Sequence, residues 1–123
     1  MATKETTYDQ AQIAEKLKAL PGWYFDDGWI RRVYKTDGWP TTLMLVNAVG
    51  YFAQAADHHP DLSVTWGRLT VKLATHSAGG ITDKDFELAK KIEELVQWQP
   101  GKAGGALEGT PQDPASAYIK YDT

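Results

Sequence analysis

The chain has 123 residues, 42% of them hydrophobic and 24% charged, which is the size and composition of a single folded domain. Its 13 basic and 16 acidic side chains give a net charge of −3, which excludes the strong positive field that attracts nucleic acid or anionic lipid. The absence of cysteine excludes disulfide bonds, cysteine-ligated metal sites and a thiol nucleophile.

The amino-terminal third predicts a helix followed by a β-hairpin. Its first residues lack the basic flank and apolar run of a signal peptide, so we expect a cytoplasmic protein. Over residues 8–20 apolar side chains recur at helical spacing, Thr7 or Asp9 can cap the helix, and a Pro-Gly pair ends it. Residues 22–25 and 29–35 are rich in β-formers and are joined by an Asp-Gly turn, which predicts two antiparallel strands.

A second helix is predicted over residues 41–57, where Pro and Thr precede a long apolar run. Small or polar residues interrupt the run on one stripe of the helix, at Asn47, Gly50, Gln54 and Asp57. The run is shorter than the roughly 18–20 apolar residues that span a bilayer, so we expect no membrane interaction. A helix that is apolar almost all round needs more cover than a small chain supplies, which favours self-association to a dimer or tetramer.

The second half of the chain predicts another pair of strands and a third helix. Apolar and polar residues alternate over 61–66 and 68–75, and the Thr82-x-x-Asp85 pattern of a capping box opens a helix that ends near residue 98. The element order is therefore α-β-β-α-β-β-α. Successive strand pairs with short connections favour an α+β fold, in which three helices pack on one face of a four-stranded antiparallel sheet.

Residues 1–98 form the predicted domain, and residues 99–123 form a tail rich in glycine and proline. Within the tail, residues 117–121 alternate like a strand, so this segment can dock on the domain. The sequence has no Gly-rich phosphate loop and no Gly-x-Ser-x-Gly pattern, which leaves nucleotide-dependent and serine-hydrolase chemistry without support.

The strongest chemical signal is the position of the histidines. His58 and His59 follow the second helix, and His76 ends the last strand. A hairpin between the last two strands would return His76 to the level of His59, so that three imidazoles converge at one end of the sheet. Because an imidazole titrates at about pH 6.5, such a cluster could transfer protons. Two other interpretations stay open: histidines that merely end a helix and face water, and a three-histidine zinc site.

These residues resemble the signature of a known family. The run Asp57-His58-His59-Pro60, followed by Trp66, Thr75-His76, Gly80 and Asp85, is similar to the pattern of pterin-4a-carbinolamine dehydratases. The resemblance extends over residues 8–98, and the predicted element order agrees with the family's fold. It implies dehydration of 4a-hydroxytetrahydropterin to quinonoid dihydropterin, which recycles the cofactor of aromatic amino acid hydroxylases. The pterin is then the substrate, and neither a metal nor a further cofactor is implied.

The resemblance also implies roles for individual residues. His58, His59 and His76 would move the protons: one protonates the departing 4a-hydroxyl and another takes the proton of pterin N5, with acid and base left unassigned. Asp85 would orient or tune a histidine in addition to closing the capping box. The residues implied in pterin binding are Asp57, Trp23, Ala74 and Thr75, the last two partly through backbone groups.

One position departs from the family pattern. Gln54 stands four residues before the first histidine, where the family usually has an acidic side chain. A neutral amide preserves a hydrogen bond but cannot serve as a base or a counter-charge. The family also includes dimerisation cofactors for a homeodomain transcription factor and assembly factors for RuBisCO. A non-catalytic binding or assembly protein on the same scaffold is therefore the alternative function.

Overall fold

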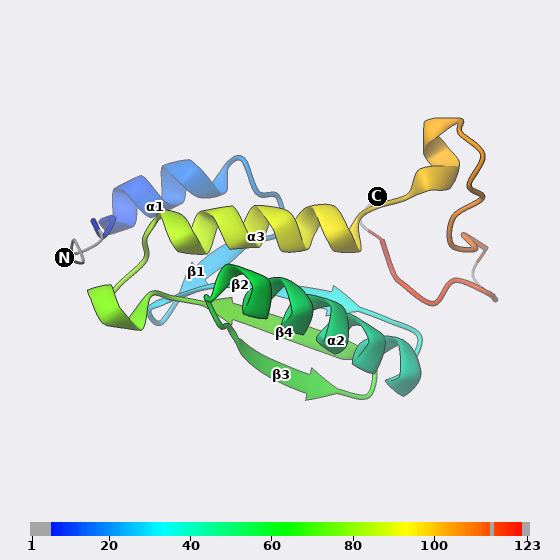
Figure 1. Cartoon of the computed structure of the whole chain (residues 1–123), viewed down its shortest axis with the longest axis horizontal. Coiled ribbons are helices and arrows are strands. Elements are labelled where there is room, and N and C mark those ends of the chain that lie inside the picture. Colours follow the sequence, from blue (N-terminus) through cyan, green and yellow to red (C-terminus); the bar gives the residue numbers. More distant parts are fainter. Residues whose placement is uncertain (1–5, 114, 122–123) are drawn as a thin grey trace.

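Three helices lie along one side of a four-stranded sheet in the computed structural model of the chain (Figure 1). The structure describes residues 6–113 and 115–121, so the first part of the stretch that lacks a signal-peptide pattern, residues 1–5, lies outside the described residues. The observed order of elements confirms the predicted α-β-β-α-β-β-α fold. In the described part of the chain, no helix is long and apolar enough to cross a membrane.

The sheet is antiparallel, with its strands in the order β1-β2-β4-β3. The strands β1 (Tyr24–Asp26) and β2 (Trp29–Lys35) form the predicted first hairpin. Its turn residues, Asp27 and Gly28, have φ angles of 47° and 83°. Positive φ at both turn positions matches the right-handed twist of the paired strands, and an Asp-Gly pair adopts this conformation readily.

The second hairpin consists of β3 (Asp61–Thr65) and β4 (Arg68–Leu73), and β4 lies in the middle of the sheet beside β2. Alternate residues of β2 and β4 are buried beneath the helices, namely Ile30, Arg32, Tyr34, Leu69, Val71 and Leu73. The alternation predicted for residues 61–66 is realised only in part, because β3 is an edge strand. Val64 is 36% exposed, and Trp66 lies in the turn after the strand and is 68% exposed.

Each of the α-helices begins either at a side chain that accepts a free backbone N–H or next to a proline. The structure has α1 (Gln10–Leu17), α2 (Trp39–Ala56) and α3 (Asp83–Val96), and two short 3-10 helices, η1 (His76–Ala78) and η2 (Pro100–Ala103). Capping boxes at Asp9 and Thr82 open α1 and α3, and a proline in the first turn opens α2. α1 is shorter than the predicted 8–20, because the residues after Leu17 continue as hydrogen-bonded turns.

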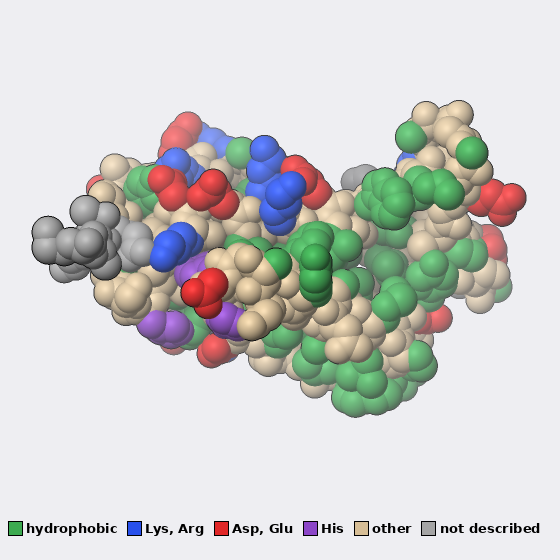
Figure 2. All heavy atoms as spheres, in the orientation of Figure 1, with side chains coloured by type: hydrophobic (Ala, Val, Ile, Leu, Met, Phe, Trp, Pro, Cys, Tyr) green, Lys and Arg blue, Asp and Glu red, His purple; other side chains and the backbone are tan. Residues whose placement is uncertain are grey.

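Only one stripe of α2 enters the core. Its buried residues are Thr42, Leu45, Val49 and Ala53. On the outer side Leu43 is 38%, Met44 48% and Tyr51 70% exposed. Figure 2 shows hydrophobic side chains gathered over the amino-terminal end of α2 and the tip of the β3–β4 hairpin. The single chain therefore leaves much of this apolar helix uncovered.

The carboxy-terminal tail returns to the sheet. Ile119 forms an antiparallel bridge with Thr36 and is 8% exposed, and the Lys120 N–H donates to the carbonyl of Lys35 at 2.9 Å. Because β1 pairs with only the first residues of β2, the tail occupies the edge that β1 leaves open near the end of β2. The strand-like segment predicted to dock thus contacts the domain, while the division of the chain at residue 98 stays a prediction.

Candidate active site

The end of α2 directs two neighbouring histidines to different sides. The helix closes at Asp57, whose φ of 50° is left-handed, a conformation that aspartate tolerates better than most residues. The His58 N–H then donates to the carbonyl of Ala53 at 3.1 Å, and Pro60 restricts the preceding residue to extended conformations. Successive side chains of an extended chain point to opposite sides, so His58 faces α3 while His59 turns back toward α2.

His58 pairs with a buried carboxylate on α3. Its Nε2 lies 2.7 Å from Oδ1 of Asp85, and the side chains of His58 and Asp85 are 12% and 0% exposed. A buried carboxylate is unfavourable unless its oxygens are hydrogen-bonded. Here Oδ2 accepts the hydroxyl of Thr75 at 2.8 Å and the backbone N–H of Thr82 at 3.0 Å. These bonds satisfy the carboxylate in its buried position and leave Oδ1 facing the imidazole of His58.

His59 contacts the residue at which the sequence departs from the family pattern. Its Nε2 lies 2.8 Å from Oε1 of Gln54, on the exposed stripe of α2. An amide oxygen only accepts, so the ring nitrogen donates in this contact. Gln54 thus orients the imidazole of His59 without placing a negative charge beside it.

His76 packs against an aromatic residue that the sequence analysis did not single out. It begins η1, with two residues between it and the end of β4, and is exposed. Its ring meets Trp29 edge-on, with centroids 5.3 Å apart and planes at 76°. Both rings line a hollow of about 290 Å³ formed by residues 28–29, 74–76 and 79–80. The antiparallel pairing of Ile30 with Leu73 is what brings Trp29 to this place, and pairing β2 with β4 from sequence would have found it.

The histidines gather at one end of the molecule, as the histidine colouring in Figure 2 shows. Each has a different partner, on α3, on α2 and on β2. His58 lines a hollow of about 280 Å³ beside α3, and His76 lines the hollow beside Trp29. Across the described ranges, no group of three or more His, Asp and Glu side chains is arranged to hold a metal ion. The arrangement combines one histidine bonded to a buried carboxylate with two exposed histidines at the same end of the fold.

The other predicted binding residues fall into two groups. Ala74 and Thr75 line the hollow beside His76, and Asp57 is exposed next to His58. Trp23 is not brought to the histidines: it is 5% exposed, and its indole N–H donates to Glu93 at 3.0 Å. Glu93 lies eight residues beyond Asp85 on α3, which is about 12 Å of helix. A buried indole N–H needs an acceptor, and Trp23 finds it away from the site.

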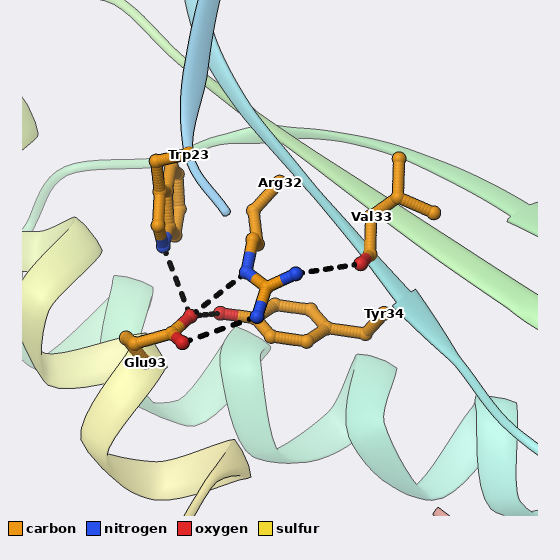
Figure 3. A network of polar contacts seen from close by, with 5 residues as sticks. All are labelled: Trp23, Arg32, Val33, Tyr34 and Glu93. Carbon is orange, nitrogen blue, oxygen red and sulfur yellow. Dashed lines mark hydrogen bonds and ion pairs between the residues drawn. The ribbon is translucent and has the colours of Figure 1, made fainter. Parts of the chain in front are cut away.

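Trp23, Arg32, Tyr34 and Glu93 form the Glu93 network, which joins α3 to β2 (Figure 3). Arg32 binds both oxygens of Glu93, with Nε at 3.0 Å and Nη2 at 3.2 Å, and the Tyr34 hydroxyl donates at 2.7 Å. Burial by itself raises the pKa of Glu93, but the hydrogen bonds outweigh it and leave that pKa below its ordinary value. Burial, and then the bond to Glu93, raises the pKa of Tyr34. The network holds the helix that carries Asp85 against the sheet.

The chain is similar in sequence and in fold to proteins of one family. The family model described as pterin 4 alpha carbinolamine dehydratase matches residues 6–95. The crystal structure of a transcriptional coactivator/pterin dehydratase from Brucella melitensis has a TM-score of 0.68 and 30% sequence identity, and the match covers 73% of this chain and 98% of that one.

Relatives that are provisionally named pterin-4-alpha-carbinolamine dehydratases match over most of their length. The protein of Aquifex aeolicus (strain VF5) is 44% identical over 88 residues, which cover 72% of this chain and 89% of the relative. The protein of Nocardia farcinica (strain IFM 10152) is 40% identical over 95 residues, which cover 77% of this chain and 99% of the relative. Residues 96–123 lie beyond the part that the family model matches.

Proposed function

Because the chain belongs to the pterin-4a-carbinolamine dehydratase family, we propose that it removes water from 4a-hydroxytetrahydropterin to give quinonoid dihydropterin. The observation that carries the proposal is the buried Asp85 bonded to His58 at 2.7 Å, with the other histidines at the same end of the fold. The reaction needs a general acid and a general base, and imidazoles supply both near neutral pH.

In this proposal His58 acts as the base. Because its Nε2 hydrogen is directed at Asp85, Nδ1 is the nitrogen that takes the proton of pterin N5. The neighbouring carboxylate stabilises the imidazolium that forms, as in other carboxylate–histidine pairs. His59 or His76 gives a proton to the 4a-hydroxyl as the carbon–oxygen bond breaks, and water leaves. Both of these histidines are exposed, so they recover the proton from solvent.

The pterin would bind among the histidines, with its N5 edge toward His58 and its ring in the hollow beside His76. The volume of this hollow, about 290 Å³, is near the lower end of ligand sites, which begin at about 300 Å³, and suits a flat bicyclic ring. Backbone groups of Ala74 and Thr75 can meet the polar edge of the ring in this proposal, and Asp57, exposed at the end of α2, stays a proposed binding residue. Trp29 takes the place first assigned to Trp23 as the aromatic border of the site.

A stopped-flow assay on chemically generated 4a-hydroxytetrahydropterin tests the proposal. The unchanged chain should accelerate dehydration over buffer, and His58→Ala, His59→Ala and His76→Ala should each lower the rate, by about 10²- to 10⁴-fold for a true acid or base. Lys18→Ala, an exposed change on α1, is the control and should keep the full rate. No acceleration by the unchanged chain, or full activity in all three histidine variants, would refute the catalytic role.

The exposed face of α2 supports self-association as a further part of the proposal. Met44 is 48% and Tyr51 70% exposed on this face, and a second copy of the chain could cover both. Light scattering during size-exclusion chromatography should then show a mass above the 13.6 kDa of one chain. Met44→Glu should return the protein to a monomer, whereas Lys18→Glu, at an exposed side chain just after α1, should not. A 13.6 kDa species at micromolar concentration would contradict self-association.

The alternative is a binding or assembly protein without dehydratase activity. Gln54 beside His59 favours it, because the amide supplies no charge to the imidazole, and so does the tail beyond the matched residues. A stoichiometric complex, isolated from the source organism with the full chain and lost on removal of residues 99–123, together with an inactive stopped-flow assay, would support this function. Dehydratase activity without a stable partner would reject it.

A further inference from the structure

The Thr75 side chain faces inward although its backbone lines the hollow. The residue is 2% exposed, and its hydroxyl lies 2.8 Å from Oδ2 of Asp85 and 2.7 Å from the hydroxyl of Thr82. The chain turns sharply here, because the Thr75 N–H donates to the carbonyl of Gly80 at 2.9 Å and η1 begins at the next residue. Thr75 and His76 therefore point to opposite sides, one to the buried carboxylate and one to Trp29.

The donor and the acceptor of each hydrogen bond around Asp85 can be assigned by elimination. An ionised carboxylate only accepts, so the single hydrogen of the Thr75 hydroxyl goes to Asp85. In the contact between the two hydroxyls the hydrogen must then come from Thr82, whose oxygen accepts the backbone N–H of Lys84 at 3.2 Å. On the other side of the carboxylate, Oδ1 accepts from Nε2 of His58. Hydrogen bonds from the first turn of α3 and from the imidazole of His58 thus converge on the carboxylate of Asp85.

We propose that Thr75 is a positioning residue for the dehydration, whose hydroxyl holds Asp85 as an acceptor aimed at His58 and so keeps the His58 hydrogen on Nε2. The inference rests on the proposed function and adds a residue that acts through another rather than on the pterin. Without this hydroxyl, Oδ2 would lose one of two donors in a position closed to water. The carboxylate would then be free to turn or to take up the proton itself.

Among the charged groups near His58, the carboxylate of Asp85 exerts the strongest electrostatic effect on the imidazole. The other charged groups that line its hollow or adjoin it are Lys84, Glu87, Lys91 and Asp57. All four are exposed, so water and salt screen them, whereas Asp85 is 0% exposed. Thr75 touches that carboxylate directly, and a change at this hydroxyl therefore reaches the imidazole through a single group.

The test compares Thr75→Val, which removes the hydroxyl at similar volume, with Thr75→Ser, which keeps it. Thr42→Val is the matched control, because Thr42 is likewise buried, at 0% exposed, and its hydroxyl lies 2.7 Å from that of Thr36. About 21 Å of helix separates Thr42 from the end of α2. Proton NMR detects the hydrogen on Nε2 of His58, which is protected from exchange by its bond to Asp85. Stopped-flow kinetics over a range of pH give kcat and KM.

Thr75→Val should lose the protected resonance of His58, narrow the pH range of activity and lower kcat about tenfold or more with KM unchanged. Thr75→Ser and Thr42→Val should keep all of these properties. Thr75→Cys, a weaker donor of similar size, should give an intermediate loss and serves if the valine variant does not fold. A protected resonance and full kcat in the valine or cysteine variant would overturn the proposal. If the unchanged chain lacks activity, the proposed function fails, and the NMR comparison still decides the role of Thr75.

Discussion

Replacing Glu93 with glutamine tests how α3 is held against the sheet. Glu93 accepts four hydrogen bonds within the Glu93 network, and the side chains of Arg32 and Glu93 are only 8% and 17% exposed. In Glu93→Gln the amide nitrogen faces donors where a carboxylate oxygen accepted, and the guanidinium loses its counter-charge. Breaking a buried ion pair costs about 3–5 kcal/mol, and the partial exposure of Glu93 places the expected loss near the lower end, about 3 kcal/mol.

Urea unfolding followed by circular dichroism measures this loss. The control is Glu15→Gln on α1, where the Glu15–Lys18 pair is as short, at 2.8 Å, but its side chains are 73% and 74% exposed. Such a pair contributes little, so the control should lose less than about 0.5 kcal/mol. The slope of the unfolding free energy against urea should stay the same in both variants. If Glu93→Gln loses no more stability than Glu15→Gln, the argument from buried charge is wrong.

The stability lost in Glu93→Gln should also depend on pH, in a direction that the structure determines. Hydrogen bonds from Arg32 and Tyr34 outweigh burial and lower the pKa of Glu93 on folding, so the folded chain binds fewer protons than the unfolded chain. The stabilisation is fully present above the ordinary value of 4.5 and is lost as the pH falls through the lower pKa of the folded state. The stability difference between the unchanged chain and Glu93→Gln should therefore shrink in acid. A difference that is constant through this range would refute the assignment.

Three further changes address the site and the tail. Gln54→Glu should raise kcat up to about tenfold by placing a negative charge beside His59, and an unchanged rate in stopped flow would show that the amide suffices. Trp29→Ala should raise KM about tenfold by removing the aromatic wall of the hollow while Trp29→Phe retains it, and equal KM values in both would reject that role. Ile119→Ala should lower the unfolding free energy by about 2 kcal/mol. Leu107→Ala, in the same tail at a side chain 58% exposed, should change it by less than about 0.5 kcal/mol. Equal losses in thermal melts would show that the docked segment adds no stability.

The fold was predictable because its central strands and its turns carry local signals. β2 and β4 alternate buried with mostly half-buried residues along their length, and the Asp-Gly turn sets the first hairpin. β3 departs from its predicted alternation because its position at the sheet edge leaves Val64 without a second neighbouring strand. Whether an apolar alternation lies in the middle or at the edge of a sheet depends on strand order, which a local pattern does not contain.

The candidate site was predictable as far as its residues stand at recognisable ends of helices and strands. His58, His59 and His76 follow recognisable element ends, and they lie at the same end of the molecule. Trp29 and the inward hydroxyl of Thr75 depend instead on the register between β2 and β4 and on the turn after β4. The partner of the Trp23 indole is 70 residues away in the chain, and no local pattern indicates it.

Asp85 links the formation of the site to the start of α3. The same carboxylate accepts the Thr82 N–H that begins the helix, the hydroxyl of Thr75 and the imidazole of His58. Each of the two dipeptides, 58–59 and 75–76, thus sends its first side chain to this carboxylate and its second, a histidine, to the surface. Burial fixes the geometry of the inner pair, while exposure lets the outer histidines exchange protons with water. A site of this kind forms only when Thr82 caps α3, so helix capping and the proposed proton transfer depend on a single group.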